Sequence, residues 1–377
     1  MADVRKKAHY CHFFSTFSPG GAEIRTCNII NALLPDCRHT IVSLDGNDSC
    51  RSMLNGQIDI EVITPSERKG GAGVFFWLYR LIQERKPDLV LTYHWGAVDA
   101  IWTSRLARAH NIIHHEDGFN ADEAYQQKTR RLWFRRIVFR LAKRIVVPSL
   151  KLADLARSSW QLPPEKIAYI PNGIDTQSFY PANGEAASFR KKLGISENEI
   201  VIGVVAGLRK EKNIELLISV FMKLVKKYPA KLMIVGDGPE RKGLNLLVKN
   251  LAIEGSVIFT GHTEAPALYY RLMDIYAISS DTEQMPISLL EAMSTGLPVI
   301  STNVGDVKQM VSEKNKDFAV ERGDVEAYLN TLKIMLQNPT LRKTLGEDNR
   351  KLVGERYTLK EQNRRYIELY EDVLADA

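Results

Sequence analysis

The N-terminal half of the chain alternates short apolar runs with longer segments in which apolar residues recur at helical spacing. The runs of strand length are HYCHFF, HTIVSL, IEVIT, DLVLTY, NIIHHE and RIVVPS. The spacing between them predicts helices at residues 21–34, 74–85, 97–109, 122–142 and 150–159. Alternating strands and helices are typical of a parallel sheet with crossover helices, so we predict an α/β domain in this half.

The second half repeats this alternation after a stretch rich in Pro, Asn, Gly and Ser at residues 175–198, which we interpret as a linker. Its predicted strands are EIVIGVVAG, AKLMIVGD, SVIFTG, DIYAISS and PVISTNV. Helices are predicted at residues 213–227, 240–251, 266–273 and 286–295, and three more follow residue 324. A chain of 377 residues is too long for one ordinary core, so two α/β domains facing across a cleft are expected.

Composition and charge narrow the class of protein. The chain is 45% hydrophobic and 25% charged, as in globular proteins, and its net charge is +6. No apolar run approaches the roughly 20 residues that span a bilayer, and the basic N-terminus has too short an apolar run for a signal peptide. We expect a cytoplasmic protein, with the option of peripheral binding at the inner face of the membrane. Reduced thiols are expected, since no zinc spacing occurs among Cys11, Cys27, Cys37 and Cys50.

One stretch of the second half, DTEQMPISLLEAMSTGLPVIST at residues 281–302, places two carboxylates beside one predicted helix. Pro286 fits the first turn, where an N–H group has no helical partner, and Gly296 ends the helix. Glu283 then lies in the loop before the helix, and Glu291 lies inside it. The preceding strand end is where nucleotides bind in doubly wound sheets.

Glycines and a cation mark two further strand ends. Gly20 and Gly21 separate the first strand from its helix, where a bare backbone can approach a ligand and the helix N-terminus favours anions. Lys212 starts the first helix of the second half, an unfavourable place for a cation unless an anion such as phosphate lies near. The GDGPERKG stretch lacks the third glycine of the dinucleotide fingerprint, which argues against a dehydrogenase.

The stretch around Glu283 and Glu291 resembles the E-x7-E signature, followed by EAM-x-x-G-x-P-V, of the retaining GT-B glycosyltransferases of family 4, the glycosyl transferases group 1. The resemblance implies two Rossmann-like, doubly wound domains. It implies that Glu291 binds the ribose hydroxyls and that Glu283 lies near the donor sugar and diphosphate, although Gln284 replaces the usual glycine. The implied donor site also includes Met285, Pro286, Ile287 and Ser288.

The stretch AGLRKEKN resembles the cation motif of the family, G-R-L-x-x-x-K-G. Lys212 matches its lysine, whereas Gly207 stands in place of its arginine and Arg209 is the candidate substitute. The resemblance also places Gly236 of the GDGP loop near the nucleotide base. The family's first loop, which faces the donor diphosphate, is matched by Gly20 and Gly21, with Glu23 beside them.

The stretch NIIHHEDG resembles an H-x-E-x-G pattern in which a histidine holds the donor sugar. His114 is the match and His115 the alternative, while Glu116 and Asp117 are candidates for contacts with sugar hydroxyls. A metal site is not expected, because adjacent residues of a strand point to opposite faces.

The resemblance implies an order of domains and a reaction. Residues 1–180 are expected to form the acceptor-side domain, 181–355 the donor domain, and 356–377 a C-terminal helix that crosses back. The expected reaction, as in polysaccharide biosynthesis, transfers a hexose with retention from a UDP- or GDP-linked sugar to a hydroxyl of a glycan or lipid-linked acceptor. Neither a metal nor another cofactor is expected, since protein cations can carry the leaving charge. The catalytic candidates are His114, Glu283 and Lys212.

Residues 128–144, KTRRLWFRRIVFRLAKR, interleave eight basic residues with large apolar ones. A core-facing helix with a cationic outer side explains part of this pattern. An interfacial helix that meets an anionic membrane surface is the sharper hypothesis. Nucleic acid is not expected as a partner, because no recognised binding module accompanies the segment.

Two alternatives stay open. A nucleotide-sugar epimerase on the same fold would need no acceptor, and it would leave the basic segment unexplained. A non-catalytic sugar-nucleotide-binding homologue would agree with the missing arginine at Gly207, but not with the retained Glu283, Glu291 and Lys212.

Overall fold

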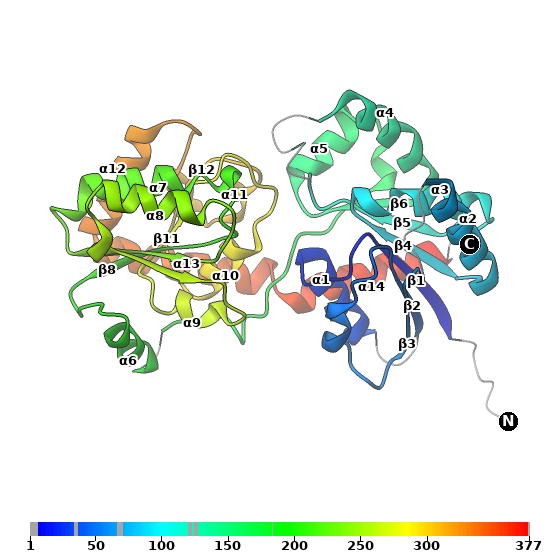
Figure 1. The fold of residues 1–377 in the computed structure, drawn as a ribbon, viewed down its shortest axis with the longest axis horizontal. Helices are drawn as coiled ribbons and strands as arrows, with labels where there is room; N and C mark the ends of the chain where they lie inside the picture. The colour runs from blue at the N-terminus through cyan, green and yellow to red at the C-terminus, as the bar shows by residue number, and fades with distance from the viewer. Residues whose placement is uncertain are drawn as a thin grey trace. The chain divides into compact units, whose positions relative to one another are not determined.

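The computed structural model describes residues 7–33, 37–65, 71–119, 123, 127–182 and 184–375. The chain forms two compact units, Met1–Pro171 with Gln362–Ala377 and Asn172–Glu361. Each unit has its own parallel sheet (Figure 1). Some residues of the predicted helices and linker lie outside the described residues, namely 34, 122, 124–126 and 183.

The first unit is built on a seven-stranded sheet with the order β3-β2-β1-β4-β5-β6-β7. All neighbouring strands are parallel. The chain order reverses between β1 and β4, and the carboxyl ends of such strands flank the usual ligand position. The strands are β1 (Ala8–Phe14), β2 (Cys37–Ser43), β3 (Asp59–Ile63), β4 (Leu89–Tyr93), β5 (Ile112–His115), β6 (Arg144–Val147) and β7 (Ile167–Tyr169).

Helices cover both faces of this sheet (Figure 1). One face carries α2 (Gly71–Arg85), α3 (Val98–Leu106), α4 (Thr129–Val138) and α5 (Leu150–Ser158). The other carries α1 (Gly21–Ala32) and α14 (Leu359–Ala375). Successive side chains of a strand point to opposite faces, so Phe13 packs with the first group and Phe14 with the second. Short 3-10 helices are η1 (Ser49–Met53), η2 (Trp95–Ala97), η4 (Phe139–Leu141) and η5 (Pro164–Lys166).

The second unit has a six-stranded sheet with the order β10-β9-β8-β11-β12-β13, again parallel throughout. Its order reverses between β8 and β11. Both units are therefore doubly wound, Rossmann-like domains, as predicted. The strands are β8 (Ile200–Val205), β9 (Ala230–Val235), β10 (Val257–Gly261), β11 (Ile275–Ile278), β12 (Val299–Thr302) and β13 (Ala319–Val320).

The helices of the second unit divide in the same way. The core on one face contains residues of α7 (Ile214–Val225), α8 (Arg241–Asn250) and α12 (Val325–Gln337). The core on the other contains residues of α6 (Gly184–Lys192), α9 (Pro266–Tyr270), α10 (Ile287–Ser294) and α11 (Val307–Met310). The α13 helix (Pro339–Arg356) contributes to both. The 3-10 helices are η6 (Lys210–Lys212), η7 (Glu254–Ser256) and η8 (Glu313–Phe318).

The structure corrects two predicted elements. The stretch 175–198 is not a plain linker, since it contains α6 and buries Ala186 and Ile195 in the core of the second unit. Phe189 packs against the same core one turn after Ala186, but surrounding polar residues hide this spacing in the sequence. In place of a helix at 122–142, the described residues form the shorter α4, followed by η4.

Candidate functional site

The point where strand order reverses in the second unit brings Lys212 and Glu283 together. Lys212 lies after β8, and Glu283 lies after the neighbouring β11. Lys212 Nζ donates a hydrogen bond to Glu283 Oε1 over 2.6 Å, and Ser280 Oγ donates to the same oxygen over 2.7 Å. The side chains of Lys212 and Glu283 are largely buried, with 16% and 12% exposed. This edge of the sheet therefore carries a cation and a carboxylate in direct contact.

Glu291 lies in the helix that follows this loop, α10. The Tyr270 hydroxyl donates a hydrogen bond to Glu291 Oε2 over 2.7 Å. Burial raises the pKa of Glu291, and the hydrogen bond from Tyr270 partly offsets that effect. The tyrosine orients the carboxylate, and the other carboxylate oxygen is chemically suited to accept a hydrogen bond from a ribose hydroxyl.

The loop that carries Glu283 is supported by the turn after β12. Gly305 has a φ of +57°, and a Cβ atom there would lie 2.4 Å from the Glu283 carbonyl oxygen. Asp306 N also donates to Gln284 O over 2.9 Å. This turn, TNVGD at residues 302–306, packs its backbone directly against the Glu283 loop, which explains why glycine is needed at Gly305.

Arg209 lies close to Gly207, the position at which the family has an arginine. A Cβ atom built on Gly207 would lie 4.0 Å from Arg209 Nε, so the Arg209 side chain runs beside that place. Arg209 Nε is 3.0 Å from Glu211 Oε1, and 58% of the Arg209 side chain is exposed. Arg209 is therefore accessible to an anion, as its predicted role requires.

The glycines of the GDGP loop have a packing role. Gly236 has a φ of +128°, and a Cβ atom there would lie 2.0 Å from Ala206 O. A Cβ atom on Gly238 would lie 2.5 Å from Leu208 O. Both glycines let this loop pack against the backbone that follows β8, and the contact of Gly236 with a nucleotide stays a prediction.

The residues between Gln284 and α10 face different environments. Met285 is buried in the core, and its Sδ atom lies 3.1 Å from Asn172 N. Pro286 is the N-cap of α10, and Ile287 and Ser288 form its first turn, half-buried. Of these four predicted donor contacts, Met285 and Pro286 are buried, and Ile287 and Ser288 keep part of their surface exposed.

In the first unit, the predicted glycine turn lies directly before α1, which begins at Gly21. A Cβ atom on Gly20 would lie 2.4 Å from Glu23 Oε2, so glycine leaves room for this carboxylate. Glu23 is buried, and burial raises its pKa.

The structure places His114 and His115 inside the first unit. His114 has no exposed surface, its Nδ1 atom lies 2.8 Å from Thr92 Oγ1, and its ring packs on Phe139. His115 is also buried, with Nε2 3.3 Å from the Tyr370 hydroxyl. Burial lowers the pKa of both imidazoles. His114 therefore has no exposed surface in this structure, and its contact with the donor sugar stays a prediction.

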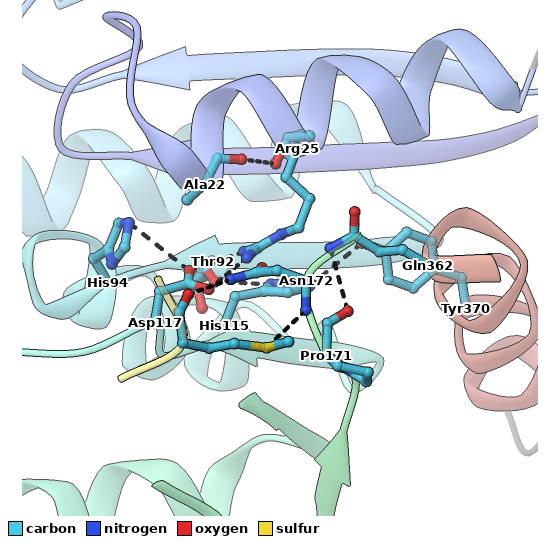
Figure 2. A network of polar contacts seen from close by, with 12 residues as sticks. Ala22, Arg25, Thr92, His94, His115, Asp117, Pro171, Asn172, Gln362 and Tyr370 are labelled. Atoms are coloured by element: carbon cyan, nitrogen blue, oxygen red, sulfur yellow. Dashed lines mark hydrogen bonds and ion pairs between the residues drawn. The ribbon is translucent and has the colours of Figure 1, made fainter. Parts of the chain in front are cut away.

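A different set of polar side chains surrounds the carboxyl ends of β1, β4 and β5 (Figure 2). Arg25 of α1 donates to both carboxylate oxygens of Asp117, over 2.5 and 2.8 Å. His94 Nε2 lies 3.8 Å from Asp117 Oδ2. Burial on its own raises the pKa of Asp117, but the Arg25 guanidinium holds that pKa well below its ordinary value. His94 keeps 35% of its side chain exposed, so it is accessible to a ligand.

His94 is not among the site residues predicted from the sequence. It follows β4 at the point where strand order reverses, with φ 56° and ψ 174°, a conformation that essentially only glycine adopts. Its position directly after the apolar DLVLTY run indicates that His94 lies at a strand end. The local pattern does not reveal which strand ends lie side by side in the sheet.

Comparisons with known proteins identify the family. The family described as "Glycosyltransferase Family 4" matches residues 19–178, and "Glycosyl transferases group 1" matches residues 185–352. An uncharacterized glycosyltransferase of Haemophilus influenzae is 35% identical over 350 residues, 90% of this chain and 93% of that protein. The chain belongs to the family 4 glycosyltransferases, which have the GT-B fold.

Two further proteins are similar over different lengths. The N-acetyl-alpha-D-glucosaminyl L-malate synthase of Bacillus anthracis is 31% identical over 214 residues, which cover 57% of this chain and 56% of that enzyme. The crystal structure of Anabaena HepE in complex with UDP has a TM-score of 0.81 at 19% identity, covering 97% of this chain and all of that one. This likeness supports the fold.

The described residues contain neither a candidate membrane span nor a candidate metal site. No helix among them combines the length and apolar character needed to cross a bilayer. In the same part of the chain, no cluster of His, Cys, Asp or Glu side chains could hold a metal ion.

Proposed function

We propose that this glycosyltransferase transfers a hexose, with retention of configuration, from a UDP- or GDP-linked sugar to a hydroxyl of a glycan or lipid-linked acceptor. The observation that carries the proposal is the contact between Lys212 and Glu283, beside the helix of Glu291, where strand order reverses in the second unit. The complex of the similar Anabaena protein with UDP supports UDP as the first donor to test.

The charges of this site suit the departure of a diphosphate. As the bond between C1 of the sugar and the phosphate oxygen breaks, negative charge grows on the leaving group. Lys212, the exposed Arg209 and the N-terminus of α7 can stabilise that charge. The acceptor oxygen bonds to C1 on the same face, and its proton passes to the departing phosphate. This scheme needs neither a dedicated base nor a metal.

Donor binding is tested first with a panel of nucleotide sugars and a thermal shift readout. One nucleotide class should raise the melting temperature, because a ligand that binds only the folded state stabilises it. Glu291→Gln should weaken that donor by about 10- to 100-fold, since hydrogen bonds to a charged group are worth ~1.5–3 kcal/mol. The matched control for Lys212→Ala is Lys226→Ala. Lys226 is an exposed lysine at the C-terminal end of α7, and its replacement should leave donor binding unchanged.

Turnover then separates the proposal from its two alternatives. A transferase forms a glycoside only when an acceptor is present, and Lys212→Ala should abolish this while the fold survives. Interconversion of the free sugar nucleotide without an acceptor would identify an epimerase. Donor binding with no turnover over an acceptor panel would identify a non-catalytic homologue. The anomeric proton of the product, observed by NMR, reports retention, and undiminished activity in EDTA would support the metal-independent scheme.

We also propose a cytoplasmic location. All four cysteines are buried thiols, a state that a reducing compartment maintains. Labelling of the thiols after rapid unfolding of freshly isolated protein tests this, and a disulfide recovered there would contradict it.

A further inference from the structure

Large apolar side chains are exposed on one side of the first unit. Of the twelve such side chains among the described residues, seven lie on the helices that cover one face of its sheet, whereas the other five are scattered. These seven define the α2–α5 surface: Phe76, Trp102, Leu106, Trp133, Phe134, Ile137 and Leu150. Exposed apolar side chains that gather on one face of a domain, rather than lying scattered singly, usually mark a site of interaction.

The α4 helix shows that this exposure is not a consequence of core packing. Its Arg135 is buried and donates to both carboxylate oxygens of Glu123, over 3.1 and 2.9 Å. In contrast, Trp133 and Ile137 lie one turn apart and are 58% and 59% exposed. A helix shaped only by its own core would bury the apolar pair and expose the arginine. The predicted cationic segment 128–144 is therefore corrected at Arg135, which cannot contribute to a surface.

Trp133 is held in its outward position by a neighbour. The Arg136 guanidinium lies 5.0 Å from the Trp133 ring centroid, within range of a cation–π contact. Arg136 Nε in turn donates to Ser159 O over 2.8 Å, which anchors the arginine to the segment after α5. The contact with Arg136 thus holds the Trp133 indole in its exposed position.

The charge around these apolar side chains is mainly positive. Arg130 and Arg140 are exposed along the same side of α4 and η4 as Trp133 and Ile137, and Arg105 is exposed next to Leu106. The nearby acids are mostly paired: Glu84 lies 3.8 Å from Arg80, and Asp154 lies 2.9 Å from Arg157. Tryptophan and arginine side by side suit the interfacial layer of a bilayer, where the ring enters the headgroup region and the cation meets phosphate.

We infer that the α2–α5 surface docks on a bilayer containing anionic phospholipid. Exposed apolar side chains supply the insertion, and the arginines supply attraction to the negative surface potential. Because docking involves no donor or acceptor, it goes beyond the proposed transfer reaction, and its test stands apart from that reaction.

The test uses sedimentation of the full chain with vesicles of phosphatidylcholine alone or mixed with phosphatidylglycerol. The protein should sediment with the mixed vesicles and be released by added salt. Trp133→Ser and Ile137→Ser should each weaken binding by about tenfold, since each removes a large apolar side chain from the interface. Leu246→Ser is the matched control, because Leu246 is equally exposed, at 59%, on α8 of the second unit. It should bind as the parent does.

Two double variants test how much the positive charge contributes to vesicle binding. Arg130→Gln with Arg140→Gln should weaken binding by about tenfold and flatten the salt dependence. Lys242→Gln with Lys249→Gln removes two exposed charges from α8 and should change neither. The thermal unfolding curves of all variants, recorded in parallel, confirm that they remain folded.

Several outcomes would overturn the inference. Absence of sedimentation with the mixed vesicles contradicts it directly. Equal losses in the α2–α5 and α8 variants would show that the surface is not the site. Sedimentation with phosphatidylcholine alone that matches the mixture would remove the role of anionic lipid. Tight binding of single-stranded RNA with no vesicle binding would assign the surface to a nucleic acid.

Discussion

His94 combines three properties that few residues of this chain share. It adopts a backbone conformation that is unfavourable for any side chain, it lies where strand order reverses, and it remains exposed beside a buried ion pair. Strain of this kind persists only where surrounding structure enforces it, and it concentrates at functional sites. We expect His94 to be the histidine that meets the substrate in the first unit.

Replacing His94 with glycine should separate strain from function. Relief of a strained backbone is worth ~1–3 kcal/mol, so His94→Gly should unfold at a higher urea concentration. Transfer should fall at least about tenfold if the imidazole contacts the substrate, a loss typical of a general acid–base or positioning group. Gln161→Gly, at φ 54°, is the control and should stabilise without loss of activity. Unchanged transfer by His94→Gly would remove the proposed role.

The ion pair between Arg25 and Asp117 should be important for stability. Only 5% of Arg25 and 16% of Asp117 are exposed, so Asp117→Asn leaves a buried guanidinium without its counter-charge. We expect a loss of about 3–5 kcal/mol in unfolding free energy. Asp154→Asn breaks the exposed pair with Arg157, which should cost less than about 1 kcal/mol. Urea unfolding measures both, and comparable losses would contradict the assignment.

At the scale of elements, the turn after β12 should control the position of the Glu283 loop. Gly305→Ala introduces a Cβ atom that meets the Glu283 carbonyl, so the loop must move. We expect about a hundredfold loss of transfer, since a displacement near 1 Å at a reacting site can cost that much. Gly323→Ala is a close control, because Gly323 also has a positive φ, +90°, but no atom lies within 4 Å of its Cβ position. Steady-state kinetics of the two variants distinguish loop displacement from backbone strain.

Most elements follow from local pattern, and the exceptions have physical explanations. The central strands are continuous apolar runs because both their faces are covered by helices, which makes them easy to recognise. Strand β13 is only Ala319–Val320, too short to show a period. The α6 helix carries few apolar residues, because only one side of it meets the core.

At the scale of the whole chain, buried histidines make the first unit sensitive to acid. His12 Nε2 lies 3.1 Å from His39 Nδ1, and His9 Nε2 lies 2.8 Å from Thr40 Oγ1. Burial lowers the pKa of all three imidazoles, to about 4 for His39. The folded state therefore excludes protons that the unfolded chain binds below its ordinary pKa near 6.5.

Stability of this unit should consequently fall as the pH drops from about 6.5 to 4. Each such histidine contributes a slope of up to ~1.4 kcal/mol per pH unit in that window, and none above it. All five tryptophans lie within residues 1–171, so their fluorescence reports unfolding of this unit alone. His39→Gln should flatten the profile, whereas His262→Gln, an exposed position of the second unit, should not alter it. A profile that stays level from pH 6.5 to 4 would contradict this account.

The amino-acid sequence was sufficient to predict the order of strands and helices along the chain, the two Rossmann-like domains and the family. These features depend on local periodicity and on motifs such as the paired Glu283 and Glu291, whose spacing along the chain carries the information. The apolar runs also indicate where each strand ends, and the residues that follow these ends include Lys212 and the glycine turns.

Folding alone established which strand ends meet and which side chains remain accessible. The order of strands in the sheet brought Lys212 to Glu283 and left His94 exposed, while it enclosed His114 and Arg135. Neighbouring residues of one strand, or of one amphipathic helix, differ in exposure through contacts with elements far away in the chain. Those contacts arise from long-range packing, which a local pattern of polar and apolar residues does not contain.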